Sequence, residues 1–288
     1  MSSKGGLALA RGNAPRSGAR SWRRPDAGMN IVKDVTGTLS ASRDVVVPFA
    51  LNDADFECLV VLLTDVPAVH LSLQAPSGAL LSPEKAAASG LNYCDTGGTR
   101  SYRFHLPLDH EPRGGAGTWK AILRRDENEP MQDPIAYDFS VMAWSTLRLR
   151  ASIARDRTQR DLLTLRAFLD ESGAPVAEGA GVRAEMIRPD GSRGVLVFRE
   201  TEPGTFEASV EASLLGTYRF DLIASGVTAS GLPFTRQELL TQDVRRRGTP
   251  RDGGSSSDVI ESPANDATSY SRALFWVCGG SSSTSTAA

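Results

Sequence analysis

The stretch Gly117-Thr118-Trp119-Lys120-Ala121-Ile122-Leu123 decides the fold class, because it combines a turn residue with an alternating strand. Glycine accepts the positive φ that many turns require, and Trp119 opens a run in which every second residue lies on one face. The same order of Gly-Thr, aromatic residue and strand returns at Gly204-Thr205-Phe206 and at Gly216-Thr217-Tyr218. This repeated combination of turns and half-buried strands is typical of antiparallel β-sandwiches.

Turn and strand signals of this kind cover the chain from about residue 31 to about residue 244. Two strands end in a Pro-x-Gly turn, one at Pro76-Ser77-Gly78 and one at Pro189-Asp190-Gly191. The sequence therefore predicts an all-β protein. It consists of two consecutive antiparallel β-sandwich domains, of jelly-roll or immunoglobulin-like type, over residues 31–145 and 146–244.

Alternating apolar residues mark the individual strands. The first domain is expected to contain strands at 44–49, 56–63, 69–73, 102–106, 119–123 and 137–143. The second is expected to contain about seven, at 147–153, 165–169, 182–186, 194–199, 206–210, 218–224 and 234–244. Pro48 favours an edge strand, whereas the strand at 56–63 is apolar on both faces and favours a central position. Ser82 and Pro83 predict the start of a helical turn inside the loop that follows Leu80.

The two ends of the chain are polar and have no hydrophobic period. Residues 1–30 contain six basic residues and one acidic residue, and residues 245–288 are rich in Gly, Ser and Thr. Such segments bury too little apolar surface to offset chain entropy, so both ends are predicted to be disordered, with Met29 a candidate start. One apolar island, Ala273–Cys278, is either a docking peptide or an unstructured remnant.

The formal net charge of −2 hides an asymmetry, because residues 1–30 contribute about +5 and the rest of the chain about −7. A nucleic-acid-binding protein usually has a basic folded domain, so nucleic acid is not expected as a partner. No segment approaches the roughly 20 apolar residues of a membrane span, so no transmembrane segment is expected. The apolar run Gly6–Ala10 is too short for a signal peptide.

Three cysteines, Cys58, Cys94 and Cys278, are too few for a disulfide framework. Cys58 alternates with the apolar residues of its strand and is expected in the core. Cys94 is expected in a loop. A Cys58–Cys94 disulfide is the alternative if the compartment is oxidising.

His105, Asp109 and His110 form the best candidate metal cluster, because two imidazoles and a carboxylate can bind zinc. Nothing in the sequence fixes their geometry, so exposed polar side chains are the preferred interpretation. Asp53 and Asp55, together with Asp65, offer oxygens for calcium in a sandwich loop. The loop lacks the glycine turn of a typical calcium site, and this interpretation is again the weaker one.

The sequence also lacks the Gly-x-Ser-x-Gly turn of serine hydrolases, and it contains only three histidines. We therefore predict no catalytic residues, no cofactor, no bound metal and no enzymatic activity. Two tryptophans have expected structural roles. Trp119 is interpreted as a core anchor rather than a sugar platform, and Trp144 is expected to pack the two sandwiches together at the domain junction.

These strands and turns resemble a known arrangement. The strand at 56–63, the strand and Pro-x-Gly turn at 69–78 and the Gly-Thr-Trp strand at 117–123 resemble the β-rich segment that follows the von Willebrand factor A domain in hemicentins and calcium-activated chloride channel regulators. The second half, with its Pro-x-Gly and Gly-Thr-aromatic turns, resembles the immunoglobulin-like module placed after that segment. The resemblance covers roughly residues 40–244.

Two features of that family are missing from the sequence. The A domain, with its Asp-x-Ser-x-Ser metal motif, is absent, since Ser255-Ser256-Ser257-Asp258 lacks the leading Asp and the preceding strand. A secretion signal is absent too. The resemblance therefore implies only the accessory scaffold, located outside the cell or at its surface, and does not imply metal-dependent adhesion.

The leading hypothesis is thus a non-enzymatic scaffold or protein-interaction module whose protein partner is unidentified. The alternative is the accessory calcium- or carbohydrate-binding part of a secreted hydrolase whose catalytic domain lies elsewhere. The neighbouring coding sequence separates the two hypotheses, because an A domain would favour the first and a protease or glycosidase domain the second.

Overall fold

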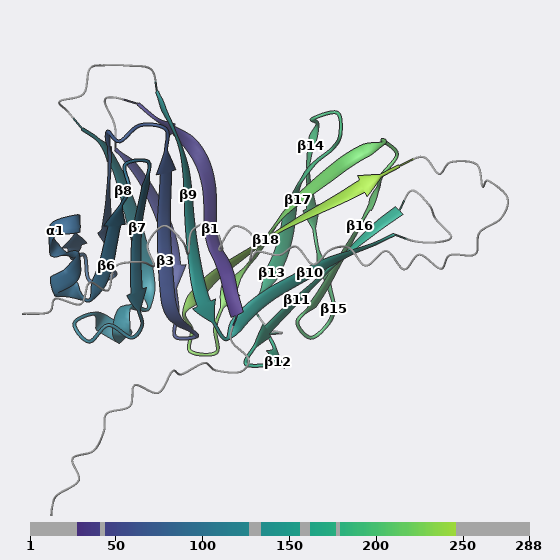
Figure 1. Cartoon of the computed structure of the whole chain (residues 1–288). Helices are drawn as coiled ribbons and strands as arrows, with labels where there is room; N and C mark the ends of the chain where they lie inside the picture. The colour runs from purple at the N-terminus through teal and green to yellow at the C-terminus, as the bar shows by residue number, and fades with distance from the viewer. Residues whose placement is uncertain (1–27, 41–43, 127–133, 156–161, 177–178, 246–288) are drawn as a thin grey trace, which may run out of the picture.

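The structure is a computed structural model that describes residues 28–40, 44–126, 134–155, 162–176 and 179–245 (Figure 1). Within these ranges the chain forms strands, one short α-helix, α1 (Pro83–Ala86), and two 3-10 turns, η1 (Ala87–Ser89) and η2 (Pro112–Gly115). The strands form three antiparallel sheets, which confirms the all-β prediction. The predicted disorder of the two ends, the island Ala273–Cys278 and Cys278 itself lie outside the described residues.

Eighteen strands make up the two halves of the described chain. Those of the first half are β1 (Gly28–Leu39), β2 (Val45–Leu51), β3 (Asp55–Thr64), β4 (Val69–Gln74), β5 (Leu80–Leu81), β6 (Leu91–Asp95), β7 (Thr99–His105), β8 (Gly117–Arg125) and β9 (Ile135–Ser145). Those of the second half are β10 (Leu147–Arg155), β11 (Leu162–Glu171), β12 (Ala174–Pro175), β13 (Gly181–Ile187), β14 (Arg193–Val197), β15 (Arg199–Glu202), β16 (Thr205–Glu211), β17 (Gly216–Val227) and β18 (Pro233–Val244).

The first sandwich is formed by β1 to β9. Five of its strands, in the order β1-β9-β3-β7-β6, belong to a nine-stranded sheet, and the other four form a sheet in the order β2-β8-β4-β5. Because β1 lies beside β9, β2 beside β8, β3 beside β7 and β4 beside β5, this is the double Greek key of a jelly roll. The strand β3 is central and β2, which contains Pro48, is an edge strand, as the sequence predicts.

The second sandwich is formed by β10 to β18. Strands β14-β13-β17-β18 continue the nine-stranded sheet, and β10-β11-β16-β15 form the opposite sheet, with β12 attached to β11. Strand β18 lies beside β1 through the register pair Gln237–Ile31, so one sheet runs through both sandwiches. In Figure 1, β18 begins at the foot of the first sandwich and rises along the second.

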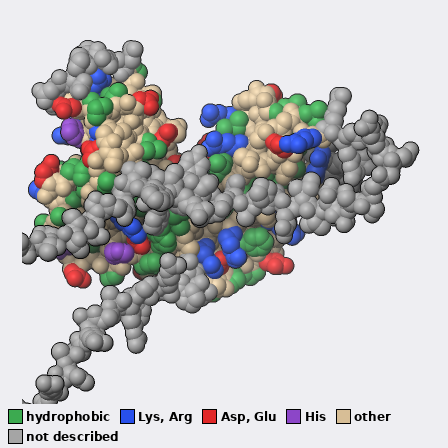
Figure 2. Space-filling view, in the orientation of Figure 1, with side chains coloured by type: hydrophobic (Ala, Val, Ile, Leu, Met, Phe, Trp, Pro, Cys, Tyr) green, Lys and Arg blue, Asp and Glu red, His purple; other side chains and the backbone are tan. Residues whose placement is uncertain are grey.

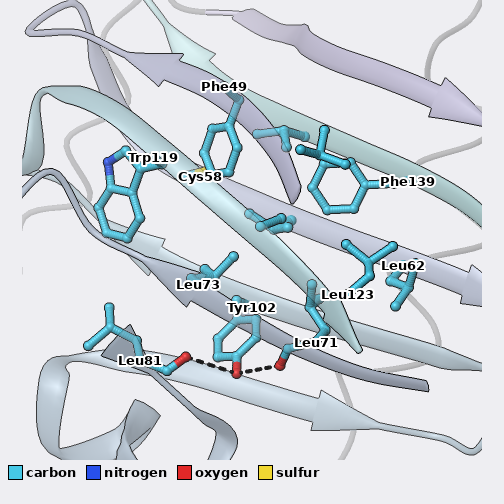
Figure 3. Packing of buried hydrophobic residues seen from close by; sticks show 14 of the residues in the cluster. Phe49, Cys58, Leu62, Leu71, Leu73, Leu81, Tyr102, Trp119, Leu123 and Phe139 are labelled. Atoms are coloured by element: carbon cyan, nitrogen blue, oxygen red, sulfur yellow. Dashed lines mark hydrogen bonds between the residues drawn. The ribbon is translucent and has the colours of Figure 1, made fainter. Parts of the chain in front are cut away.

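Each sandwich encloses its own hydrophobic core. In the first core Trp119 is fully buried, with its ring centroid 6.3 Å from that of Phe49 and 5.0 Å from that of Phe104. The Tyr102 hydroxyl on β7 crosses to the facing sheet and donates to the Leu71 carbonyl at 3.0 Å (Figure 3). Trp119 is therefore the core anchor that the sequence predicts.

The two kinds of turn that recur in the sequence meet in space. Gly117 and Gly216, which begin β8 and β17, have φ values of 145° and 125°, a region that favours glycine. A Cβ on Gly117 would lie 3.1 Å from the Cβ of Pro76, and a Cβ on Gly216 would lie 2.8 Å from the Cβ of Pro189. Each sandwich thus packs the glycine of one turn against the proline of the other, and glycine is required there for both conformation and space.

Three strand predictions are wrong in detail. Residues 28–30, predicted to belong to a disordered tail, are part of β1, whose alternation is broken by a bulge. Cys94 lies in β6 and not in a loop. The single strand predicted at 194–199 is two strands, because the chain passes at Phe198 from one sheet of the second sandwich to the other.

The helical turn after Ser82 is confirmed as α1, with Ser82 as its N-cap residue. The Ser82 hydroxyl donates to the Glu84 carboxylate at 2.5 Å and makes no capping bond to the helix backbone. The cap of this short helix is therefore its extended backbone geometry and Pro83 in the first turn, rather than a side-chain hydrogen bond.

Cys58 is fully buried in the first core, as predicted, and burial raises the pKa of its thiol well above the ordinary value. The alternative of a Cys58–Cys94 disulfide is wrong, since these two residues are not bonded to each other. Cys58 pairs with Phe104 on β7, whereas Cys94 lies beyond β7 and pairs with Ser101, three residues along that strand. A disulfide needs Cα atoms within about 7 Å, which this register does not allow.

Candidate binding surface

The residues predicted as zinc ligands are not brought together. His105 ends β7, and Asp109 and His110 are exposed in the segment between β7 and β8. Across the part of the chain that the structure describes, no group of three His, Cys, Asp or Glu side chains is placed to hold a metal ion. His105, Asp109 and His110 are therefore exposed polar residues that the fold does not bring together.

The interpretation of Asp55 as a calcium ligand is wrong, because the guanidinium group of Arg236 binds its carboxylate. Arg236 on β18 is fully buried, and its Nη2 donates to Asp55 Oδ1 at 2.5 Å and to Ser145 Oγ at 3.0 Å. Its Nε donates to the Leu147 carbonyl at 3.2 Å. The other Asp55 oxygen accepts the backbone N–H of Asn52 at 2.9 Å, so the carboxylate is fully engaged.

This junction pair, Asp55 and Arg236, joins the two sandwiches, since Asp55 begins β3 and Arg236 lies on β18. Burial lowers the pKa of Arg236, and the Asp55 carboxylate opposes that shift. Burial also raises the pKa of Glu171 at the end of β11, and the negative charge of Asp53 adds to this effect. Asp53 is exposed and Asp65, the third predicted calcium ligand, is exposed too. Asp55 and Glu171 thus lie near Arg236, whereas Asp65 follows the far end of β3.

Arg236 is not predicted as a buried residue, because an arginine in a strand is expected on the solvent face. The signal was present in the alternation of β18, where Phe234 and Leu240 are buried and place Arg236 on the same inward face. What the sequence does not contain is the partner, since Asp55 lies far away in the chain.

The outer face of the nine-stranded sheet is apolar close to the junction. In an antiparallel sandwich the outer face normally carries polar residues. Here β1, β3 and β9 present five apolar side chains, which we name the seam face: Met29, Ile31, Leu59, Met142 and Trp144. Met142 is 7% exposed and the other four are half-buried.

Strand pairing makes the seam face one continuous patch. Ile31 pairs with Met142, which pairs with Leu59 on its other side, and Met29 pairs with Trp144. Directly opposite side chains on one face of a sheet lie about 4.5–5.5 Å apart, so these residues touch or nearly touch. The row through Ile31 crosses all nine strands of the sheet. It runs Val197, Arg183, Ile223, Gln237, Ile31, Met142, Leu59, Arg103 and Asn92.

One side of the seam face is bounded by an ion pair. Arg103 on β7 contacts Glu57 on β3, with 2.5 Å between Nε and Oε1. The guanidinium carbon of Arg103 also lies 5.9 Å from the centroid of the Trp144 ring. Trp144 therefore packs on the outer face of the first sandwich. That it also packs the two sandwiches together stays a prediction, and Arg236 makes a buried contact across the junction.

The outer face of the five-stranded sheet is polar by comparison. Arg148 and Arg150 contact Asp170 at 2.8 and 3.0 Å, and Arg166 contacts Glu207 at 2.6 Å. Figure 2 shows Lys and Arg side chains on the second sandwich with Asp and Glu side chains beside them. The seam face differs from this surface in offering aliphatic, thioether and indole groups, which suit contact with another apolar surface.

Among the described residues no helix is long and apolar enough to cross a membrane.

The seam face has one ion pair at its boundary, Arg103 and Glu57, and the two side chains of that pair bind each other. The patch therefore presents aliphatic, thioether and indole groups with this charged pair at its edge.

Solved structures of similar shape are distant from this chain, and neither a protein-family model nor a curated protein matches it. A DUF4785 family protein of Legionella pneumophila is similar over 83% of this chain and 70% of its own, with 13% identity and a TM-score of 0.46. A lipase of Bacillus licheniformis in propeptide form is similar over 81% of this chain and 43% of its own, with 15% identity and a TM-score of 0.41.

A β-1,2-glucanase of Parabacteroides distasonis is similar over 75% of this chain and 32% of its own, with 7% identity and a TM-score of 0.28. The chain spans less than half the length of this glucanase and of the lipase. All three TM-scores are below 0.5, so these names assign no activity to the chain. None of the three is described as von Willebrand factor A-associated, and that resemblance stays a prediction.

Proposed function

We propose that this protein is a non-enzymatic interaction module that binds a protein partner through the seam face. The observation that carries the proposal is the contiguous apolar patch on the outer face of the shared sheet, where sandwiches normally present polar residues. Methionine and tryptophan are enriched at protein interfaces, and Met29, Met142 and Trp144 supply them here. The Arg103–Glu57 pair supplies the polar rim that such interfaces have.

We further propose that the second sandwich is an immunoglobulin-like module. The order β10-β11-β16-β15 matches the A-B-E-D sheet of that fold, and β18-β17-β13 matches its G-F-C sheet, with β14 as an additional edge strand. On β17, at the position of strand F, the Tyr218 hydroxyl accepts the backbone N–H of Leu214 at 3.0 Å. This upstream contact corresponds to the tyrosine corner of immunoglobulin-like domains.

A charge placed on the seam face tests the interaction proposal. Leu59→Glu puts a carboxylate in the centre of the patch, and Val46→Glu puts one on an apolar residue that is 50% exposed on β2, in the other sheet. Circular dichroism and urea unfolding check that both variants keep the fold. Quantitative affinity capture from the native host should retain at least one protein on wild type and Val46→Glu that is lost from Leu59→Glu.

A photo-cross-linking residue at position 31 or 59 should then form a covalent link to that protein, and one at position 46 should not. Equal capture by wild type and both variants, or cross-linking that is strongest at position 46, would contradict the seam face as the binding surface.

Carbohydrate binding is the second candidate function, and Trp144 favours it, because a half-exposed indole beside polar groups can receive an apolar ligand face. Arg103 covers part of that ring, which leaves less of it to a sugar. Isothermal titration against a panel of soluble glycans, with Trp144→Ala as the control, separates the two candidates. Glycan binding that disappears in Trp144→Ala would replace the protein partner with a sugar.

A further inference from the structure

Most edges of the three described sheets carry a feature that blocks strand addition, as natural sheets commonly do. Strand β2 contains Pro48 and β10 carries Arg148 and Arg150. Strand β5 is two residues long, β15 has the sequence Arg-Glu-Thr-Glu, and α1 and η1 pack against β6. The remaining edge is β14, and it differs from these five.

Strand β14 has the sequence Arg193-Gly194-Val195-Leu196-Val197, with a charge only at its first residue and no proline. Val195 is 66% exposed and Val197 is 80% exposed, the highest values among the large hydrophobic side chains of the described residues. Two exposed valines on an open, regular edge strand are the features that natural sheets usually avoid. They indicate that this edge is covered in the working protein.

The backbone of β14 shows which of its groups are available. The Phe198 N–H donates to the Val182 carbonyl of the β13 side at 3.1 Å, and the Arg188 N–H donates to the Ser192 carbonyl at 2.9 Å. In an antiparallel pair the residues alternate between bonding the neighbour and facing away. The even-numbered residues of β14 therefore bond β13, and Arg193, Val195 and Val197 present their N–H and C=O groups to the open side.

We propose that β14 pairs with β14 of a second copy of this chain, so that the protein forms a two-fold dimer with a continuous eighteen-stranded sheet. An antiparallel pair of identical strands is the isologous contact that a two-fold axis generates. This inference is independent of the seam face, because it uses an edge of the sheet and not its outer face.

An axis through Val195 uses the whole strand. Val195 of one copy then lies opposite Val195 of the second copy, and Arg193 lies opposite Val197 at both ends of the pairing. The three outward-facing residues of each strand bond one another, which satisfies the open backbone groups. The aliphatic stem of each arginine covers a valine of the second copy, and the two guanidinium groups stay at opposite ends.

The contact is small. A pairing of five residues buries less than the roughly 1,200 Å² of a standard interface, so we expect a dissociation constant in the micromolar range, between about 10 and 300 μM. Sedimentation equilibrium of the full chain over that range of concentration should show a monomer–dimer equilibrium.

Val195→Pro is the sharpest test, because its N–H points to the open side and its loss removes no bond to β13. The variant should keep the melting temperature of wild type and raise the dissociation constant more than about tenfold. Val197→Lys should have the same effect by placing a charge on the paired face. Val46→Lys, on the edge strand β2, is the matched control and should dimerise like wild type.

A cysteine scan fixes the register. Paired Cα atoms in a hydrogen-bonded antiparallel pair lie about 5.5 Å apart, within the range for a disulfide. Val195→Cys should therefore give an oxidised dimer that Val197→Cys does not give, since two copies of position 197 lie far apart. A wild-type chain that stays monomeric at about 300 μM, or a dimer that Val195→Pro leaves intact, would overturn the proposal.

Discussion

The two sandwiches share a sheet, yet they hold their tyrosines in different ways. In the first, the buried Tyr102 hydroxyl reaches across to the facing sheet and donates to the Leu71 carbonyl. In the second, the equally buried Tyr218 hydroxyl accepts an N–H from Leu214, four residues upstream on the same stretch of chain. The first tyrosine connects two layers and the second orders one local turn. A buried tyrosine hydroxyl can thus form its hydrogen bond between the two sheets of a sandwich or within one stretch of chain.

The two sandwiches also differ in how many large apolar side chains they expose. Of the large hydrophobic side chains that are exposed in the described residues, three belong to the first sandwich and six to the second. The first set is Val46, Leu63 and Leu80, and the second is Phe168, Val195, Val197, Leu214, Leu215 and Val227. The second sandwich therefore exposes more single apolar side chains, whereas the apolar seam face of the first sandwich is half-buried.

Removing the junction pair should destabilise both sandwiches, because Asp55 lies in the first and Arg236 in the second. Arg236→Met leaves Asp55 buried without its counter-charge, and we expect a loss of about 3–5 kcal/mol in the free energy of unfolding. Urea unfolding followed by tryptophan fluorescence measures the loss. The double variant Arg236→Met with Asp55→Leu replaces the pair by apolar groups and should recover much of it. A double variant as unstable as the single one would contradict a pair-specific role.

Trp119→Ala should break the first sandwich alone. It empties a fully buried aromatic site and leaves the Gly115 carbonyl without the indole N–H that donates to it at 2.8 Å. The expected loss is about 3–5 kcal/mol. Lys120→Ala, on the opposite face of β8, should change stability by less than about 0.5 kcal/mol. Equal losses in the two variants would mean that the facing of β8 is wrong.

The second sandwich should show a pH dependence that comes from Glu238. Glu238 lies on the inward face of β18 between Arg236 and Leu240, and burial raises its pKa to about 7. The unfolded chain releases this proton near pH 4.3, whereas the folded chain holds it until about pH 7, so stability falls as pH rises between these values and stays lower above them.

Glu238→Gln removes this pH dependence. It should stabilise the protein by about 1–3 kcal/mol at pH 8 and have almost no effect at pH 4. Thermal unfolding of wild type and variant at the two pH values measures the difference. The same stabilisation at both pH values would show that the effect is one of packing and not of ionisation.

The two buried tyrosines offer the finest comparison. Tyr102→Phe leaves a buried carbonyl without its donor across the sheets and should cost about 1–2 kcal/mol. Tyr218→Phe leaves one N–H in a part-buried turn and should cost about 0.5–1 kcal/mol. Denaturant unfolding of both variants gives the two values. A larger loss for Tyr218 would reverse the view that the first sandwich is fastened across its layers.

The strands that the sequence predicts well are those whose face is set by alternation alone. Trp119, Ala121 and Leu123 are all fully buried, as their period of two requires. Strand β1 is missed because a bulge between Ile31 and Lys33 interrupts the alternation of inward and outward residues. Residues 28–30, on the near side of the bulge, then resemble a polar tail. The break at Phe198 is missed because the apolar run Val195–Phe198 passes directly into Arg199 without a turn residue.

The candidate surface was only half visible in the sequence. The run at 56–63 is apolar on both faces, and this predicts the central position of β3. It does not predict that the outward residue Leu59 meets Met142 of β9, which in turn meets Ile31 of β1. That meeting depends on register between strands far apart in the chain. The junction pair is hidden for the same reason, because a buried arginine and a distant aspartate have no local pattern in common.

The junction pair can form only late during synthesis of the chain. Asp55 and Arg236 are 181 residues apart. At roughly 5–20 residues per second, a ribosome needs on the order of 10–40 s to deliver the arginine after the aspartate. For that interval the first jelly roll can assemble nine strands around its core, but the carboxylate at its base has no cation and β1 has no neighbour on its second side. The junction side of the first sandwich is therefore complete only once the last strand of the second has been translated.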